Sequence, residues 1–427
     1  MLIGIKIEKL FDIFDYDIEF KKEGITILTG PNGYGKTTVL KILDALASQN
    51  GFFFVRLLFK KIVLEFSDKN TITLDKKNSD EVLITNSNLK KTMCFNNNSL
   101  EKILRDLPFD RKDENSWIDH LTGEIYDTRR LLSKVIHKFP EFAEELHQFG
   151  LSEILKQMPA VYFISEQRLL RPVPDTRRNY EFNQYGERAE FINTIEEYAK
   201  EFSDNITKET FARELAQVSQ ELDSSFPRRL FEQKQDISED EFNQRFDIVK
   251  KTQRKLNEYG LANIKEDNHP TYKKEISKAL HVYINDAEKK LSIFSELLKK
   301  LEIFTHTLNV SRLTFKYIAI SKENGFKFFT DKGKPLATSD LSSGEQQEVV
   351  LLYELLFKVK AGTLVLIDEP ELSLHVVWQK QFLDDLFKII ELQKISIVVA
   401  THSPQIINNH WDLTVDLEEL RDAAISK

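Results

Sequence analysis

Residues 30–38 read GPNGYGKTT, a stretch that fits the pattern G-x-x-x-x-G-K-[ST], with Gly30, Gly35, Lys36 and Thr37 at its fixed positions. Glycines allow such a loop to turn tightly, so that its backbone N–H groups point inward at phosphate oxygens. The helix that follows presents its positive N-terminal end to the same anion. The pattern therefore predicts a phosphate-binding loop, in which Lys36 reaches the β- and γ-phosphates of a nucleotide and the Thr37 hydroxyl ligates Mg²⁺.

The residues on either side of this loop supply the setting that it needs. Residues 24–29 form a short apolar stretch typical of a strand, and the apolar residues of 37–48 fall on one side of a helix. A strand, a loop and a helix are therefore expected in succession. The candidate nucleotide contacts in the loop are Asn32, Gly33, Gly35, Lys36, Thr37 and Thr38.

The composition limits the classes of protein to consider. The chain has 427 residues, enough for two or three domains. Its 60 Lys and Arg against 68 Asp and Glu give a net charge of −8, which argues against sequence-independent nucleic-acid binding but leaves room for a local basic patch. The one cysteine, Cys94, excludes an internal disulfide and a cysteine-rich zinc site. Without an apolar run near the ~18 residues of a membrane span or a signal-peptide layout, the sequence predicts a soluble, cytoplasmic protein.

The N-terminal half is expected to be rich in strands. Strands are predicted at 2–8 and 16–20, and an antiparallel meander at 52–58, 61–66, 71–74 and 82–84. The following stretch, from 100 to 158, favours mostly helix and is expected to form a helical insertion at about 98–158.

A helical arm is predicted at 186–307. Residues 280–308 repeat apolar side chains at alternating spacings of four and three, an a/d heptad pattern in which only Thr305 is polar. Outer helices of about 37 residues would span roughly 55 Å at 1.5 Å per residue. Breaks are expected at Phe226-Pro227 and between Gly260 and Pro270, which gives three or more helices. The alternative is a helical subdomain folded on the body, because a heptad shows only that helices pack.

Further motifs follow the helical segment. Residues 341–347 read LSSGEQQ and precede an apolar helix. Residues 363–370 read TLVLIDEP, a continuous apolar run before two acids, which is typical of a strand buried on both faces in a parallel sheet. Residues 395–400 form another such strand, followed by THS at 401–403. Before the arm, a compact strand at 161–164 is followed by SEQR.

In their order, these motifs resemble those of ABC-type ATPase heads of the group that includes RecF, RecN, SMC proteins and the ATPase half of OLD-type nucleases. GPNGYGKTT resembles Walker A, LSSGEQQ the ABC signature, TLVLIDEPELSLH Walker B with its D-loop, and THS the switch-histidine loop. Glu166-Gln167 stands where the family has its Q-loop. The resemblance implies an α/β fold, an ABC-type ATPase head with a mixed sheet around the P-loop core, an antiparallel β subdomain and an inserted helical coiled-coil arm. The expected domains are 1–185 for the N-terminal half of the head, 186–307 for the arm and 308–427 for the C-terminal half.

The resemblance also implies which residues hold ATP and Mg²⁺. Lys36 would hold the phosphates, while Thr37 and, through water, Asp368 would hold the metal. Gln167 would sense the metal and the γ-phosphate.

The implied catalytic residues are Glu369, His402 and Lys36. Glu369 would act as the general base or orient the attacking water, and His402 would contact the γ-phosphate. In this family the signature residues, here Ser342 and Gly344, act across a dimer interface on the nucleotide that the partner holds.

The sequence departs from the family pattern at three places. Ser343 stands where many members have glycine, and His375 ends the D-loop where transporters usually have aspartate, a form that resembles the OLD-like branch. The Q-loop is matched by position only, so Glu166 or Arg168 could do the work of Gln167. A basic cluster follows, which consists of Arg168, Arg171, Arg177 and Arg178. Two interpretations are open: the cluster is a solvated face or a neighbour of the phosphates, or it binds nucleic acid or a protein partner.

The long helical stretch between Lys36 and Ser342 disfavours a transporter subunit, and few residues follow His402, so an appended nuclease domain is not expected. ATPases of this form resemble subunits of bacterial antiviral systems such as PARIS or Septu. We therefore expect a homodimer or higher homo-oligomer that serves as a regulatory scaffold for a separate effector protein, with DNA as a further possible partner and no membrane. The alternative is a RecF- or SMC-like DNA-repair clamp.

Overall fold

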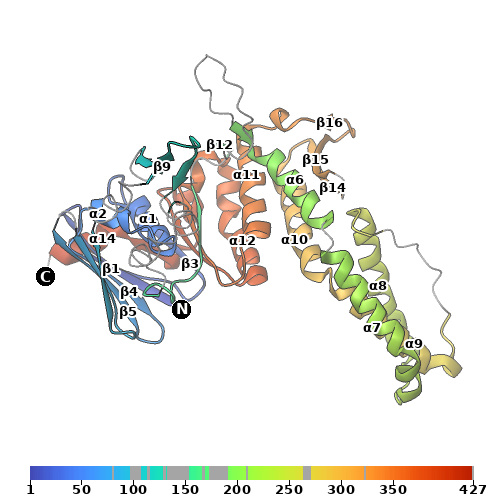
Figure 1. Ribbon diagram of the computed structural model, residues 1–427. Coiled ribbons are helices and arrows are strands. Elements are labelled where there is room, and N and C mark those ends of the chain that lie inside the picture. The colour runs from blue at the N-terminus through green and yellow to red at the C-terminus, as the bar shows by residue number, and fades with distance from the viewer. Residues whose placement is uncertain are drawn as a thin grey trace. The chain divides into compact units, whose positions relative to one another are not determined.

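The computed structural model describes residues 1–78, 81–96, 107–112, 116–127, 131, 153–165, 169–172, 191–207, 210–262, 271–321 and 324–425 (Figure 1). The chain divides into two compact units. The first comprises 1–168, 172–190 and 359–427, and the second comprises 169–171 and 191–358. The signature thus belongs to the second unit together with the arm helices, whereas the phosphate loop and the Walker B strand belong to the first.

The first unit contains a five-stranded parallel sheet that carries the phosphate loop. Its strand order is β11 (Val161–Ile164), β17 (Leu364–Asp368), β18 (Ser396–Ala400), β3 (Ile25–Thr29) and β19 (Thr414–Asp416). Helix α1 (Lys36–Ala47) packs against β11, β17 and β18, and the unit also holds α12 (Val376–Gln393) and α13 (Pro404–Ile407). Strands β3 and β17 are buried along their whole length, as their continuous apolar runs predict.

A six-stranded antiparallel sheet forms the rest of the first unit. Its order is β2 (Phe14–Glu19), β1 (Leu2–Leu10), β4 (Lys61–Phe66), β5 (Thr71–Asn78), β6 (Glu81–Asn86) and β7 (Lys91–Asn96). Alternate residues of β4 and β6 are buried in one hydrophobic core with α1. The predicted α/β fold with a P-loop core and an antiparallel subdomain is therefore confirmed, while the sheet around the P-loop, expected to be mixed, is parallel in its five described strands.

The strand predicted at 52–58 is wrong, because this segment forms helix α2 (Gly51–Arg56). The Asn50 side chain caps the helix by accepting a hydrogen bond from the Phe53 N–H at 3.4 Å. At the other end, the Lys76 ammonium donates to the Val55 carbonyl at 2.8 Å. Aromatic strand propensity thus yields to burial of Phe54 in the core.

The mostly helical pattern predicted for 98–158 is wrong at 109–127, where the structure describes strands. Three short strands, β8 (Phe109–Arg111), β9 (Ser116–Asp119) and β10 (Ile125–Asp127), form an antiparallel sheet. Trp117 of β9 is buried in the same core as the larger sheet, and this long-range contact was not visible in the local pattern. Most of the remaining insertion lies outside the described residues.

The second unit consists of helices with two small sheets. Its helices are α6 (Thr194–Thr207), α7 (Thr210–Glu232), α8 (Glu239–Glu258), α9 (Ser277–Ser292), α10 (Ser295–His306) and α11 (Ser343–Tyr353). One sheet is formed by β14 (Lys316–Ser321), β15 (Gly325–Thr330) and β16 (Pro335–Leu336), the other by β12 (Leu170–Pro172) and β13 (Phe191–Asn193). Two π-helical segments, Thr307–Arg312 and Glu354–Lys358, follow α10 and α11. In the described part of the chain, every helix is too short or too polar to cross a membrane.

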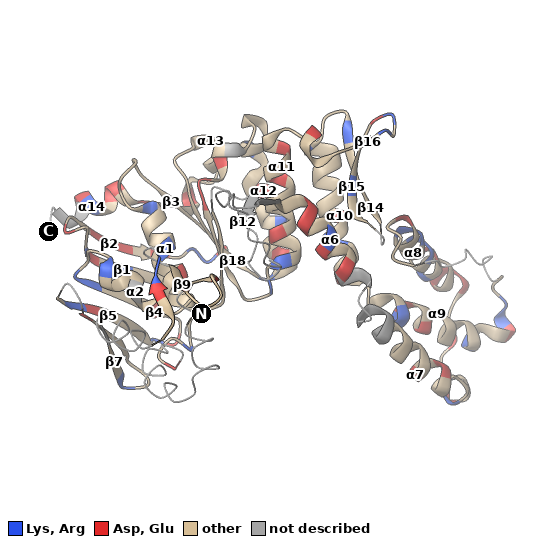
Figure 2. Ribbon diagram, turned by 45° about the horizontal axis from the view of Figure 1, so that its top comes forward, with Lys and Arg blue, Asp and Glu red and all other residues tan. Residues whose placement is uncertain are grey.

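The heptad residues form a buried seam among the arm helices. Leu291, Phe294 and Leu298 are each at most 9% exposed and join the core of α8 and α9. Acidic and basic residues are interspersed along α7, α8 and α9 (Figure 2). The earlier heptad at 191–202 packs elsewhere, because α6 lies against β15 and its Tyr198 ring stacks on Tyr353 at 4.5 Å.

Two predicted helix boundaries in the arm are corrected. The pattern from 280 to 308 is interrupted at Ile293 and Phe294, so that α9 and α10 are separate helices of 16 and 12 residues. Conversely, α7 continues through Pro227. Proline has no N–H to offer the Asp223 carbonyl four residues before it. In the same part of the helix, the Arg229 guanidinium donates to Leu222 O at 2.6 Å and the Ser225 hydroxyl donates to Glu221 O at 2.7 Å, which adds side-chain bonds to the turn before the proline.

We expect Leu298→Ala to lower the free energy of unfolding by about 2–5 kcal/mol, because it leaves a cavity in the arm seam. Chemical denaturation of the purified chain measures the change. Lys299→Ala, on the exposed side of the same helix, is the matched control and should change stability little. Equal effects of the two substitutions would contradict the burial of the seam.

Candidate functional site

The phosphate loop has the predicted strand–loop–helix geometry. It connects β3 to α1 and ends at Gly35, which has a φ of 83° in the left-handed region. This conformation strains any residue other than glycine, and a Cβ at Gly35 would come within 3.2 Å of Leu10 Cδ2, so the Leu10 side chain would also have to shift. Asn32 and Gly33 are exposed at the outer side of the loop, and Thr38 lies in the first turn of α1.

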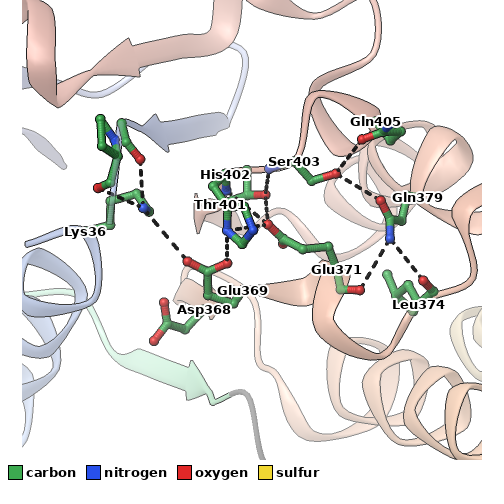
Figure 3. A network of polar contacts seen from close by, with 12 residues as sticks. Lys36, Asp368, Glu369, Glu371, Leu374, Gln379, Thr401, His402, Ser403 and Gln405 are labelled. Atoms are coloured by element: carbon green, nitrogen blue, oxygen red, sulfur yellow. Dashed lines mark hydrogen bonds and ion pairs between the residues drawn. The ribbon is translucent and has the colours of Figure 1, made fainter. Parts of the chain in front are cut away.

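Lys36 is buried between the loop and the acidic end of β17. Its ammonium donates to the Gly30 carbonyl at 2.8 Å and lies 4.0 Å from Glu369 Oε1. A buried cation needs polar partners, and of these two the Gly30 carbonyl is neutral whereas the Glu369 carboxylate can carry a negative charge. The amine therefore stands at the junction of the loop with the Walker B strand (Figure 3).

Two of the three residues predicted to hold the metal, Thr37 and Asp368, meet in the structure; the third, Gln167, lies outside the described residues. Thr37, at the start of α1, donates its hydroxyl to Asp368 Oδ1 at 3.0 Å, although the two residues are far apart in the sequence. They are brought together because β17 and the phosphate loop end at the same edge of the parallel sheet. Oxygen ligands of this kind are what Mg²⁺ prefers, so the side chains present fit the ion.

Glu369 is held in a strained backbone conformation directly after β17. Its φ of 44° and ψ of 57° are left-handed, which is uncommon for a residue other than glycine, and its N–H donates to the Ala400 carbonyl at 2.9 Å. Its Oε2 lies 2.6 Å from His402 Nδ1. Burial raises the pKa of the Glu369 carboxyl above its usual value, Glu371 raises it further, and His402 opposes both.

Glu371 is a functional candidate that the sequence reasoning missed. It is 8% exposed, and its Oε1 accepts hydrogen bonds from the Thr401 hydroxyl at 2.5 Å and from the His402 N–H at 3.0 Å. Its backbone carbonyl accepts from Gln379 Nε2, and the Ser403 hydroxyl donates to Gln379 Oε1 at 2.9 Å (Figure 3). The acid thus ties the segment after β17 to the switch-histidine segment.

The signal for Glu371 was present in DEPE, where a further acid follows the Walker B pair. Among the described residues, Glu369, Glu371 and His402 also place three potential metal-ligand atoms within 4.8 Å of one another. Because Oε1 of Glu371 already accepts two hydrogen bonds from the switch segment, we assign it a positioning role.

We expect Glu371→Ala to lower the rate of ATP hydrolysis by about ten- to a hundredfold with little change in ATP binding, because His402 loses its support. Glu371→Gln keeps an acceptor oxygen for the same two donors and should retain most of the rate. Phosphate release measured on both variants tests this. Equal loss in both would indicate that the charge of Glu371, for example on a metal, matters more than its hydrogen bonds.

The signature lies at the N-terminus of α11 in the second unit. Ser342 caps this helix, since its hydroxyl accepts from the Glu345 N–H at 3.3 Å while Glu345 Oε2 accepts from the Ser342 N–H at 2.7 Å. Lys316 also bonds Glu345 Oε2, at 2.8 Å. Gly344 follows in the first turn, so the predicted signature residues share one helix end.

The remaining predicted residues have different outcomes. His375 is the N-cap of α12 and accepts a hydrogen bond from the Val377 N–H at 3.4 Å. Gln167, the predicted Q-loop residue, lies outside the described residues, as do Arg168, Arg177 and Arg178 of the basic cluster.

The chain is similar to known proteins along most of its length. The model of the family described as "AAA domain, putative AbiEii toxin, Type IV TA system" matches residues 25–408. The spermidine/putrescine import ATP-binding protein PotA of Ureaplasma parvum is 22% identical over 416 residues, which cover 93% of this chain and 68% of that protein.

Among solved structures, the Smc head domain of Pyrococcus furiosus, with an extended coiled coil and bound to the C-terminal domain of ScpA, is similar at 13% identity and a TM-score of 0.37, covering 100% of this chain and 98% of its own. The SMC head domain of Thermotoga maritima is similar at 10% identity and a TM-score of 0.33, covering 95% and 90%. Because the family model spans most of the sequence, including the phosphate loop, Walker B and the switch histidine, the chain belongs to this AAA-domain family of ABC-type, ATP-binding ATPases.

Proposed function

We propose that this protein binds and hydrolyses ATP at a composite site shared by two protomers arranged head to tail. The observation that supports this most strongly is the convergence of the predicted phosphate, metal and catalytic groups at one edge of the parallel sheet. These groups are Lys36, Thr37, Asp368, Glu369 and His402.

The chemistry follows from what each side chain can do. Lys36 would bind the β- and γ-phosphates, while Thr37 and, through water, Asp368 would hold the Mg²⁺ ion. When bound, Mg²⁺ neutralises charge on the phosphate oxygens and thereby favours attack by water. Glu369, with its raised pKa, takes up a proton from the attacking water more readily than an exposed glutamate. His402, on the other side of the Glu369 carboxylate, contacts the γ-phosphate.

The second protomer would supply the signature. The N-terminal end of α11 offers backbone N–H groups and a positive helix end, which suit a γ-phosphate. The resemblance to SMC- and RecF-like heads implies that Ser342 and Gly344 reach the nucleotide of the partner. Oligomerisation would thus be required for turnover.

We further propose that this ATPase is a regulatory scaffold for a separate effector, as in PARIS- or Septu-like antiviral systems. Among the described residues, the one group of His, Cys, Asp and Glu side chains close enough to share a metal is at the ATPase site itself. The arm helices α7, α8, α9 and α10 offer surfaces that the ATP site does not require. The description of the matched family names a toxin–antitoxin system, whereas the name of PotA refers to spermidine and putrescine import. The long helical segment between Walker A and the signature favours the regulatory role.

The scaffold role predicts a stable protein partner. We expect co-expression with the neighbouring open reading frame to yield a complex whose stability changes with ATP. If ATP binds the complexed and the free ATPase with different affinities, it shifts the equilibrium between them by that difference. The alternative, a DNA-repair clamp, predicts ATP-dependent DNA binding with a steep salt dependence. A salt series with DNA of several lengths measures this. Tight ATP-dependent DNA binding without a protein partner would overturn the scaffold in favour of the clamp.

A further inference from the structure

We propose that the segment from β19 into helix α14 (Leu417–Ile425) is a clamp that holds the phosphate loop in its nucleotide-binding shape, with Glu418 and Arg421 as positioning residues. This inference rests on the proposed ATP-binding function. The segment lies beyond residues 25–408, which the family model matches, and none of the recognised motifs includes it. Three separate contacts connect it to the loop.

The first contact fixes the strand that enters the loop. β19 pairs in parallel with β3, with Asp416 opposite Thr29, the last residue before Gly30. The Thr29 hydroxyl donates to Asp416 Oδ2 at 3.1 Å. The other oxygen, Oδ1, accepts from the Glu418 N–H at 2.8 Å and so caps α14. One carboxylate therefore joins the end of β3 to the start of α14.

The second contact is close packing beside the first residue of the loop. Gly30 has a φ of 133°, and a Cβ built there would stand 3.4 Å from Leu417 Cβ and 3.7 Å from the Glu418 N atom. Leu417 is fully buried. The Gly30 carbonyl also accepts a hydrogen bond from the Lys36 ammonium. The start of α14 therefore packs against the residue whose carbonyl positions Lys36.

The third contact holds the middle of the loop through Tyr34. Its hydroxyl donates to Glu418 Oε1 at 3.1 Å and accepts from Arg421 Nη1 at 2.5 Å. The Arg421 guanidinium also lies over the Tyr34 ring, 5.0 Å from its centroid. The Tyr34 carbonyl accepts from the Tyr16 hydroxyl at 2.7 Å, so this loop residue is held on both its backbone and its side chain.

These contacts have a consequence for binding. A phosphate loop binds through backbone N–H groups that must all point inward, and a loop held in that shape loses less freedom when the nucleotide arrives. Among the described residues, Glu418 and Arg421 bond Tyr34 of the loop, whereas Glu369 and His402 bond each other. Loosening the clamp should therefore weaken ATP binding without slowing the chemical step.

The test uses the full chain with Arg421→Ala, Glu418→Ala and Tyr34→Phe. Glu419→Ala is the matched control, because it removes an exposed carboxylate from the same turn of α14. We expect the Kd for Mg·ATP, measured by calorimetry, and the KM for hydrolysis to rise by about tenfold in Arg421→Ala, with kcat unchanged and Glu419→Ala like the parent. A purely structural defect would instead reduce the active fraction and lower kcat at constant KM.

Hydrogen exchange measured without nucleotide separates failure of the clamp from failure of the proposed function. Amides of residues 30–37 should exchange faster in Arg421→Ala and Tyr34→Phe than in the parent chain and Glu419→Ala. Tyr34→Phe removes only the hydroxyl group that Glu418 and Arg421 bond. If the parent chain does not bind ATP, the proposed function is wrong, while faster exchange still supports the clamp. Unchanged exchange together with unchanged Kd in both variants would overturn the clamp.

Discussion

Glu369→Gln is expected to reduce ATP hydrolysis by about two to four orders of magnitude while ATP remains bound, because the amide cannot take up the proton of the attacking water. Binding should survive, since Lys36 and the Thr37–Asp368 pair are separate groups at the same site. The substitution also removes a partly buried carboxylate that lies 4.0 Å from the Lys36 ammonium, so without nucleotide it leaves this cation without its charged partner, a charge that the phosphates of ATP can balance. Retention of labelled ATP on the purified variant, together with phosphate release, measures both effects.

Lys36→Ala is the contrasting variant. Without its ammonium, the loop loses the cation that balances the phosphates, and ATP retention should fall along with hydrolysis. The assigned roles predict retention without hydrolysis for Glu369→Gln and loss of both for Lys36→Ala. Equal loss of retention in the two variants would show that Glu369 supports binding and not the chemical step.

Ser342→Arg is expected to abolish turnover while each protomer still binds ATP. A large cation at the N-terminal end of α11 would block the approach of the γ-phosphate held by a partner, whereas the phosphate loop of the same chain is unchanged. For the parent chain, turnover per protomer should rise with protein concentration until the dimer saturates. Hydrolysis by a strictly monomeric preparation at the full rate would contradict the composite site.

The control for Ser342→Arg must separate the interface from the helix cap. Ser342 caps α11, and losing such a cap costs about 0.5–2 kcal/mol. Thermal unfolding of Ser342→Arg and Ser342→Asn measures this cost, since asparagine caps as well as serine does. Ser343→Arg, at the neighbouring exposed position, tests whether any added cation nearby has the same effect.

The sequence alone determined the parts of the site that depend on neighbouring residues. The spacing of Gly30, Gly35 and Lys36 predicts the loop, because a tight glycine turn before a helix is a local property of the chain. The continuous apolar run before Asp368 likewise predicts a buried parallel strand that ends in acids, and β17 is such a strand. The heptad at 280–308 predicts a packing seam, and Leu298 is buried in one.

Tertiary structure alone decided what depends on residues far apart in the chain. Phe54 is in a helix and Trp117 in a strand, against the local pattern, because burial in a shared core outweighs propensity. Glu371 gains its role from Thr401, and Tyr34 is held by Arg421, through contacts that the parallel strand order creates. Side chains at the ends of adjacent parallel strands meet whatever their separation in sequence. The motifs therefore identify the groups that bind and react, while the groups that hold them in place follow only from the fold.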